Sequence, residues 1–99
     1  MRFLVIERMN QTALLSMKEF SKLAKAGLEY RVKLQKKGKI VGGPFLDILA
    51  DGYILETKTI EEMGEIFFNS PTNFLVEREV HPLGTYQDSL EGVVELSKK

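Results

Sequence analysis

Two hydrophobic periods alternate along this chain of 99 residues, and their order limits the folds that it can adopt. Apolar residues that alternate or run continuously are typical of strands, whereas apolar steps of three and four residues are typical of helices. The sequence therefore predicts the order strand, helix, strand, strand, helix, strand. We expect the strands at 2–8, 39–49, 53–58 and 74–80, and the helices at 11–37 and from 60 to the sequence NSP at 69–71.

The first predicted helix carries an apolar stripe that can rest on a sheet, from Met17 to Leu34. Asn10 or Thr12 can cap its start, and Gly38 suits a left-handed position after its last turn. Gly27 lies on the stripe, where we expect a close approach between helix and sheet.

The second and third strands are expected to form a hairpin whose turn is Ala50–Gly52. Pro44 has no amide hydrogen to donate, so its strand should be an edge strand or contain a bulge. Thr59 and Glu62 have the spacing of a capping box for the second helix. The tail at 84–99 is compatible with a short helix or an added strand.

With right-handed crossovers, this order gives an α+β, ferredoxin-like βαββαβ domain that occupies residues 1–99. It has a four-stranded antiparallel sheet with both helices on one face. The first strand nevertheless carries apolar residues on both faces, with Phe3 and Val5 on one and Leu4 and Ile6 on the other. Since a bare apolar face is rarely left exposed, we predict a homodimer packed sheet to sheet, with larger assemblies left open.

The composition excludes several classes of partner. Lys plus Arg and Asp plus Glu both total 14, so charge gives no reason to expect nucleic acid or an anionic membrane. There is no cysteine, which removes thiolate chemistry, and with a single histidine only carboxylates are left to build a metal site, so we expect none. No signal peptide or membrane-spanning segment is recognisable, so we expect a cytoplasmic protein. The space between the two sheets, or between the sheet and the long helix, is expected to hold a small-molecule ligand.

Four short segments resemble the dimeric α+β barrel superfamily, in particular muconolactone isomerase-like proteins, with YCII-like proteins as near relatives. These segments are LQKKGKIVGG at 34–43, TIEEM at 59–63, NSP at 69–71 and EVHPL at 79–83. The resemblance implies a small-molecule isomerase that moves a proton on a lactone or similar ring without a cofactor. The alternative is a non-catalytic ligand-binding or assembly module with the same fold.

The chain departs from the family pattern at three places. The first helix has Ala24–Gly27 where the family commonly carries acidic and basic residues, and Gly84–Tyr86 stands where a histidine tends to follow the Pro-Leu pair. The His–Asp pair of YCII-like proteins involves an early histidine, whereas the one here, His81, ends the fourth strand. These departures concern the activity that the resemblance implies and not the fold.

Abstraction of a proton next to a carbonyl requires a base and a donor for the developing enolate. Histidine is the natural base near neutral pH, so His81 is a catalytic candidate, although it could simply end its strand. Glu79 and Glu56 are further candidates, because apolar walls raise the pKa of a glutamate. The alternative is that the strand glutamates, which also include Glu7 and Glu77, are solvated or pair with Arg8 and Arg78.

Three side chains are candidates for binding an anionic substrate. Tyr53 and Tyr30 can donate a hydrogen bond, and Arg31 can bind a carboxylate. The alternative is a core position for Tyr30 and a solvated helix face for Arg31. The glycine-rich VGGPF at 41–45 lacks the spacing of a phosphate loop and is expected to line a pocket rim.

Overall fold

A computed structural model describes residues 1–10 and 15–99 of the chain. The elements follow the predicted order, with one helix added at the end. They are β1 (Arg2–Met9), α1 (Met17–Lys36), β2 (Ile40–Pro44), β3 (Ala50–Glu56), α2 (Ile60–Phe68), the 3-10 turn η1 (Asn73–Leu75), β4 (Val76–Pro82) and α3 (Tyr86–Ser97). Among the described residues, no helix combines the length and apolar character needed to cross a membrane.

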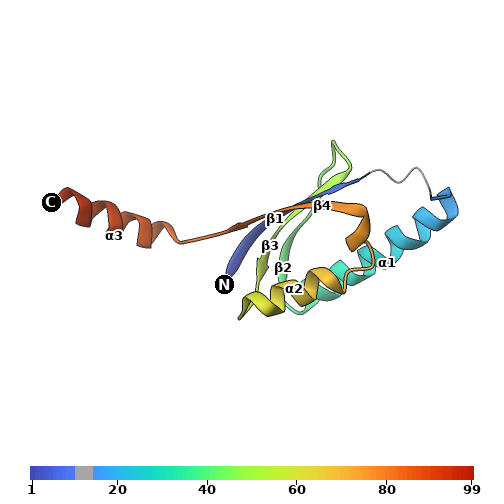
Figure 1. The fold of residues 1–99 in the computed structure, drawn as a ribbon, viewed down its shortest axis with the longest axis horizontal. Helices are drawn as coiled ribbons and strands as arrows, with labels where there is room; N and C mark the ends of the chain where they lie inside the picture. Colours follow the sequence, from blue (N-terminus) through green and yellow to red (C-terminus); the bar gives the residue numbers. More distant parts are fainter. Residues whose placement is uncertain (11–14) are drawn as a thin grey trace.

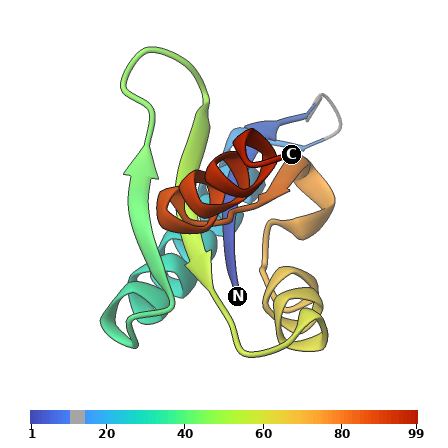
Figure 2. The same cartoon turned by 90° about the vertical axis from the view of Figure 1, so that its left-hand side faces the viewer.

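The strands form an antiparallel sheet in the order β2-β3-β1-β4. Helices α1 and α2 lie side by side on one face of this sheet, α1 toward the β2 edge and α2 toward the β4 edge (Figures 1 and 2). This βαββαβ arrangement is the ferredoxin-like fold. The predicted fold class and the edge position of the strand that contains Pro44 are confirmed.

The sheet has two different faces because side chains alternate along each strand. Phe3, Val5 and Glu7 of β1 point toward the helices and are buried. Leu4 and Ile6 point to the other face, which we call the open face and which is only partly covered. The core on the helix side consists of a cluster around β1 and β3: Phe3, Val5, Leu34, Ile40, Tyr53 and Leu55.

The ends of α1 differ in part from the prediction. Ser16 is the N-cap and accepts a hydrogen bond from the amide of Glu19, so α1 begins at Met17 and not near Gln11. Asn10 lies just after β1, where its amide bonds to a backbone carbonyl of η1, and Thr12 lies outside the described residues. Gly38 has a φ of 74°, which confirms the left-handed residue expected after the helix.

The β2–β3 hairpin turns earlier than predicted. Ala50–Gly52 belongs to β3, and the connection is formed by residues 45–49. The amide of Phe45 donates to the carbonyl of Ala50 and closes the hairpin, and the absence of a side chain on Gly52 leaves room for the Phe45 ring. The ADG sequence was therefore a misleading turn signal, because the strand pairing of Asp51 with Pro44 and Glu7 overrides it.

Two further differences concern the connection between α2 and β4. β4 starts at Val76, because η1 takes up the residues before it. Gly27 makes its close approach to Thr72 in this connection and not to the sheet: a Cβ atom on Gly27 would lie 2.8 Å from Cγ2 of Thr72. The predicted helix start is confirmed, since the amide of Glu62 donates to the hydroxyl of Thr59.

The tail forms a helix, α3, that stands away from the rest of the fold beyond the end of the sheet (Figure 1). All residues from His81 to Lys99 are exposed. The molecule is consequently long, with extents of 61 × 26 × 22 Å.

Candidate functional site

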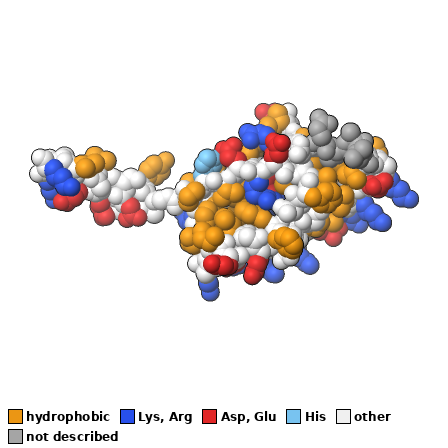
Figure 3. Space-filling view, viewed as in Figure 1, with side chains coloured by type: hydrophobic (Ala, Val, Ile, Leu, Met, Phe, Trp, Pro, Cys, Tyr) orange, Lys and Arg blue, Asp and Glu red, His pale blue; other side chains and the backbone are white. Residues whose placement is uncertain are grey.

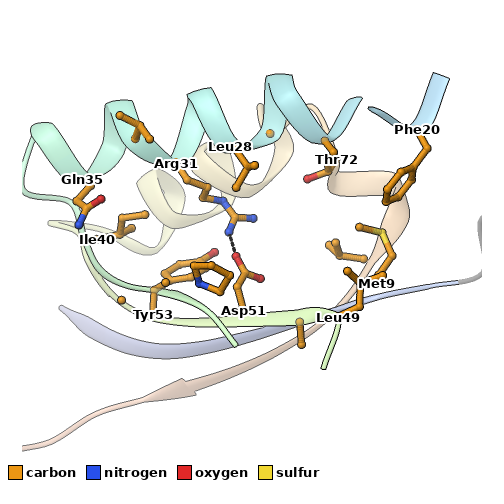
Figure 4. A pocket seen from close by; sticks show the side chains of 18 residues that line it. Met9, Phe20, Leu28, Arg31, Gln35, Ile40, Leu49, Asp51, Tyr53 and Thr72 are labelled. Carbon is orange, nitrogen blue, oxygen red and sulfur yellow. Dashed lines mark hydrogen bonds and ion pairs between the residues drawn. The ribbon is translucent and has the colours of Figure 1, made fainter. Parts of the chain in front are cut away.

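A cavity of about 440 Å³ lies between α1 and the β2–β3 side of the sheet (Figure 4). Its walls are mostly apolar, with Phe20 and Leu28 from the helix and Met9 and Leu49 from the end of the sheet. Arg31, Asp51 and Tyr53 are the charged and phenolic groups of its lining. Apolar walls with a few converging polar groups are typical of small-molecule sites, and the volume is in their usual range.

Edge strand β2 forms part of the rim through its glycines. Gly42 has a φ of 151°, and a Cβ atom there would lie 2.6 Å from Cα of Tyr53. Only glycine fits such a backbone and such a close approach. Gly42, Gly43 and Pro44 all line the cavity, so this segment is at the pocket rim as the sequence suggested, and it pairs with β3 residue by residue without a bulge.

A buried carboxylate, Glu7, anchors the polar end of this region. The hydroxyl of Tyr53 donates to Oε1 of Glu7 at 2.9 Å, and Arg31 also donates to this oxygen. Arg78 donates to Oε2 through Nε at 2.8 Å, with its Nη2 at 2.6 Å from the same oxygen. Glu7 is only 1% exposed, and two guanidinium groups compensate for its removal from water.

The two arginines are held by aromatic rings as well as by charge. Arg31 reaches down from α1 with its guanidinium carbon 5.0 Å from the ring centre of Tyr53. Arg78 comes from edge strand β4, lies 4.1 Å from the ring centre of Phe67 and donates to Oδ1 of Asn73 at 2.9 Å. Stacking on rings and fixed hydrogen bonds restrict both guanidinium groups to one orientation.

Asp51 lies on β3 directly opposite Glu7 on β1 and binds the same arginine, Arg31. Its side chain is 28% exposed and forms part of the cavity lining (Figure 4). Burial raises the pKa of Asp51, Arg31 opposes this rise, and the negative charge of Glu7 adds to it. Asp51 is therefore a partly buried carboxyl group in contact with the cavity and with a cation.

The two tyrosines of the predicted site have different positions. Tyr53 lies in the cavity wall, and burial followed by the charge of Glu7 raises its pKa, so its hydroxyl stays protonated. Tyr30 is oriented toward α2, where its hydroxyl donates to the carbonyl of Ile66 at 2.7 Å. Of the three predicted substrate-binding residues, the structure thus brings Tyr53 and Arg31 together at the cavity and places Tyr30 in the packing between helices.

The three predicted catalytic residues lie on the open face of the sheet, on the other side from the cavity. His81 is opposite Leu4 and Glu79 opposite Ile6 in the strand register, and Nε2 of His81 is 2.6 Å from Oε2 of Glu79. This contact, more than the nearby Arg8, lowers the pKa of Glu79. Glu56 is 3.3 Å from Arg2 at the far end of the same face.

Sequence reasoning missed Asp51. The alternative that strand glutamates pair with Arg8 and Arg78 is confirmed for Glu7 with Arg78 and for Glu79 with Arg8. Strand alternation contained a signal for Asp51, since Asp51, Tyr53 and Leu55 are spaced by two residues and share one face. The ADG turn pattern hid this signal. In the described parts of the chain, no group of three or more His, Cys, Asp or Glu side chains is placed to hold a metal ion.

No family model matches the chain, and no curated protein matches it significantly. Among solved structures, it is similar to 5-chloro-2-hydroxyhydroquinone dehydrochlorinase (TftG) from Burkholderia phenoliruptrix AC1100, in complex with 2,5-dihydroxybenzoquinone. The TM-score is 0.66 with 24% sequence identity, over 89% of this chain and 98% of the other. The likeness is one of fold.

Proposed function

We propose that this protein binds a small, mostly apolar ring compound bearing a carbonyl or ionised oxygen, and catalyses proton transfer on it without a cofactor. The observation that carries this proposal is the Asp51–Arg31 pair in the wall of a mostly apolar cavity. The neighbour of similar fold is a dehydrochlorinase in complex with a hydroxylated quinone. The resemblance to muconolactone isomerase-like and YCII-like proteins points to the same class of substrate.

In this proposal, Asp51 is the base. A carboxylate in a partly buried site is a stronger proton acceptor than one in water, in keeping with its raised pKa. It accepts a proton from a ring carbon next to the carbonyl, and the electron pair of that C–H bond moves toward the carbonyl oxygen. Return of the proton to another ring carbon completes an isomerisation, whereas loss of a leaving group from the same intermediate completes an elimination.

Arg31 is assigned to the developing oxyanion. A guanidinium has five N–H donors, and the contacts of Arg31 with Glu7 and Asp51 engage its two terminal nitrogens. Because Glu7 fixes this cation from below, it is already in place when negative charge forms on the substrate, which is the condition for electrostatic stabilisation. Tyr53 supports this arrangement by donating to Glu7.

We also propose that the open face is the surface of a homodimer. Its centre is apolar, with Leu4, Ile6 and Ile54 partly exposed and Val41 70% exposed. Around this centre lie charged pairs, Arg2–Glu56 and Arg8–Glu79, together with His81. An apolar centre with a polar rim is the usual composition of a protein interface.

The open face also offers a second candidate position for the catalytic step, formed by the predicted residues His81, Glu79 and Glu56. The 2.6 Å contact between His81 and Glu79 is the observation that favours it, because a carboxylate orients a histidine that acts as a base. A purely ligand-binding module is the other alternative, since Glu7, Asp51, Arg31 and Arg78 already balance one another in charge.

Binding of 2,5-dihydroxybenzoquinone, followed by calorimetry, tests the cavity. We expect Arg31→Met to weaken binding at least tenfold and His81→Gln to leave it unchanged. Proton transfer is tested by NMR in D₂O, as the enzyme-catalysed rate of exchange of ring C–H groups in a panel of lactones and hydroxyquinones. Loss of exchange in Asp51→Asn but not in His81→Gln supports the proposal, whereas the reverse pattern moves the step to the open face. Binding without any accelerated exchange would identify a ligand-binding module.

A further inference from the structure

The polar side chains beside the cavity form a band across the sheet. Strand register places Asp51, Glu7 and Arg78 side by side on β3, β1 and β4. Arg31 contacts both carboxylates from the helix above. On the face shown in Figure 3, basic side-chain atoms also lie between two groups of hydrophobic side chains. Because side chains on one face of a strand repeat every two residues, or about 7 Å, the band divides the helix-facing side of the sheet into two parts.

These two parts differ in how tightly they are packed. On one side of the band, Tyr53 and Ile40 are only 5% and 7% exposed and belong to the core. On the other side, toward the start of α1, the cavity wall is apolar but open, with Leu28 60% exposed and Leu49 69% exposed. Figure 4 shows this division, with the ion pair between the two sides. A ligand that contacts the band can therefore extend in one direction only.

We call the open side the Met9 compartment. Its floor is the next row of the sheet, in which Met9 pairs with Val76 and the amide of Met9 donates to the carbonyl of Leu49 at 3.2 Å. Thr72 is its polar member among the described lining residues, and the hydroxyl of Thr72 lies 3.4 Å from that of Ser70. Its roof is one side of α1, at four-residue steps: Phe20, Ala24 and Leu28. The compartment consequently offers apolar contacts with almost no competing hydrogen-bonding groups.

The cavity is larger than a single ring requires. An apolar cavity of about 150 Å³ holds one benzene molecule, whereas this cavity measures about 440 Å³. The small side chain of Ala24 leaves space between Phe20 and Leu28 in the roof. A ring held at the band therefore leaves room in the Met9 compartment for a second apolar group of about the same size.

We propose that the substrate is an amphiphilic ring compound, whose oxygen-bearing edge contacts Arg31 and Asp51 and whose alkyl or aryl substituent occupies the Met9 compartment. This inference rests on the function proposed above and adds the substituent and its direction. Met9, Phe20 and Leu49 then determine which substituents are accepted, because they line the apolar part of the cavity beyond the reacting groups.

A homologous series of ligands tests the substituent. Calorimetry with 2,5-dihydroxybenzoquinone and its 3-methyl, 3-propyl and 3-pentyl derivatives should show Kd falling about fourfold for each buried methylene. Ala24→Leu should remove at least half of the gain between methyl and pentyl, because the larger side chain fills the compartment. Leu49→Ala changes an exposed side chain, so it should fold normally and weaken the pentyl compound more than the methyl compound. Val41→Leu adds bulk on the open face and should reproduce the wild-type series.

Methionine methyl NMR locates the substituent directly. The chain has four methionines, and Met9 is the methionine among the described residues that line the cavity. In protein with ¹³C-labelled methionine methyl groups, the pentyl chain should give nuclear Overhauser effects to Met9. Met1 and Met17 are 55% and 79% exposed and serve as internal references. Toluene, which has no oxygen, should shift the Met9 signal at millimolar concentration without shifting theirs.

Three outcomes would overturn the inference, and they are distinguishable from failure of the proposed function. A Kd independent of chain length, with the parent quinone still bound, would remove the substituent and leave the proposed function intact. If neither toluene nor the pentyl chain affects Met9, the compartment does not take apolar groups, whatever reaction the protein catalyses. A Met9 shift with toluene but no binding of any quinone would refute the proposed substrate and, with it, the direction assigned to the substituent.

Discussion

Glu7 and Asp51 face each other across neighbouring strands, β1 and β3, and are joined by a single cation. Two carboxylates in adjacent register positions repel each other, and Arg31 from the helix above is what makes their proximity tolerable. The same contact ties α1 to the sheet at the point where the cavity opens. The polar cluster therefore serves the fold and the candidate site at once.

Removal of the Arg31 charge should destabilise the fold strongly. Arg31→Met removes one of the two cations that contact Glu7 and, among the described residues, the ion-pair partner of Asp51. Breaking a buried ion pair from one side costs about 3–5 kcal/mol. We expect this loss in the free energy of unfolding, measured by urea denaturation. Arg31→Lys should lose less stability, because it keeps the positive charge. Some loss should remain, because an ammonium group cannot bridge both carboxylates in the same geometry.

Arg2→Met is the matched control for this experiment. Arg2 also pairs with a strand glutamate, Glu56, but both side chains are more than half exposed. Exposed pairs contribute about 0–1 kcal/mol, so this variant should unfold close to wild type. An equal decrease in the free energy of unfolding for Arg31→Met and Arg2→Met would show that the buried cluster contributes no more to stability than an exposed ion pair.

Asp51 should impose a pH dependence with a defined sign. Its pKa is raised, mainly by burial, so the folded chain holds this proton to a higher pH than the unfolded chain. Its contribution to stability therefore falls as pH rises from its ordinary pKa near about 3.9 through the raised value, and stays low above it. In Asp51→Asn, the free energy of unfolding relative to wild type should increase across this window.

Glu79→Gln provides a control of opposite sign. The pKa of Glu79 is lowered, chiefly by its contact with His81, so Glu79 contributes stability that is lost as pH falls through the lowered value. Relative to wild type, Glu79→Gln should therefore lose stability as pH rises from acid. If both variants shift in the same direction with pH in denaturant titrations, the assignment for Asp51 is wrong.

The tyrosines should separate ligand binding from packing. Tyr53→Phe and Tyr30→Phe each remove one hydrogen bond, to Glu7 and to the carbonyl of Ile66 respectively, at a cost of about 1–2 kcal/mol in stability. Because only Tyr53 lines the cavity, its variant alone should weaken the binding of 2,5-dihydroxybenzoquinone in calorimetry. Weaker binding in Tyr30→Phe by the same factor would mean that the ligand is not held in this cavity.

The fold was predictable because hydrophobic period and breaker residues agree along most of the chain. Pro44 indicated an edge strand, and the order of strands and helices indicated a four-stranded sheet with both helices on one face. The predicted ends of strands and helices were wrong where a local turn signal competes with strand pairing. Asp51–Gly52 resembles a turn, but seven consecutive pairings between β1 and β3 hold it in the strand.

The candidate site was less predictable, because it depends on register. Tyr53 and Arg31 could be named from residue type and stripe position, and they do lie in the cavity wall. The opposition of Glu7 and Asp51 follows only from the alignment of two strands separated by the whole of α1 and β2. Side chains alternate between the two sheet faces along β4, and the register with β1 places His81 beside Leu4 on the open face. The chemistry of a histidine alone does not reveal this position.

The contact of Gly27 with Thr72 predicts opposite effects for two helix glycines. Gly64 in α2 has open space around its Cα, so Gly64→Ala should stabilise the fold by about 0.5–1 kcal/mol through helix propensity. Gly27→Ala gains the same propensity, but its Cβ would meet Cγ2 of the buried Thr72 at 2.8 Å. Overpacking typically costs about 1–3 kcal/mol, so we expect a net loss of about 1 kcal/mol in thermal or urea unfolding. Thr72→Ser removes that methyl group, and in this background Gly27→Ala should become neutral or stabilising. If Gly27→Ala stabilises the wild-type chain as much as Gly64→Ala does, then α1 and the α2–β4 connection are not in close contact.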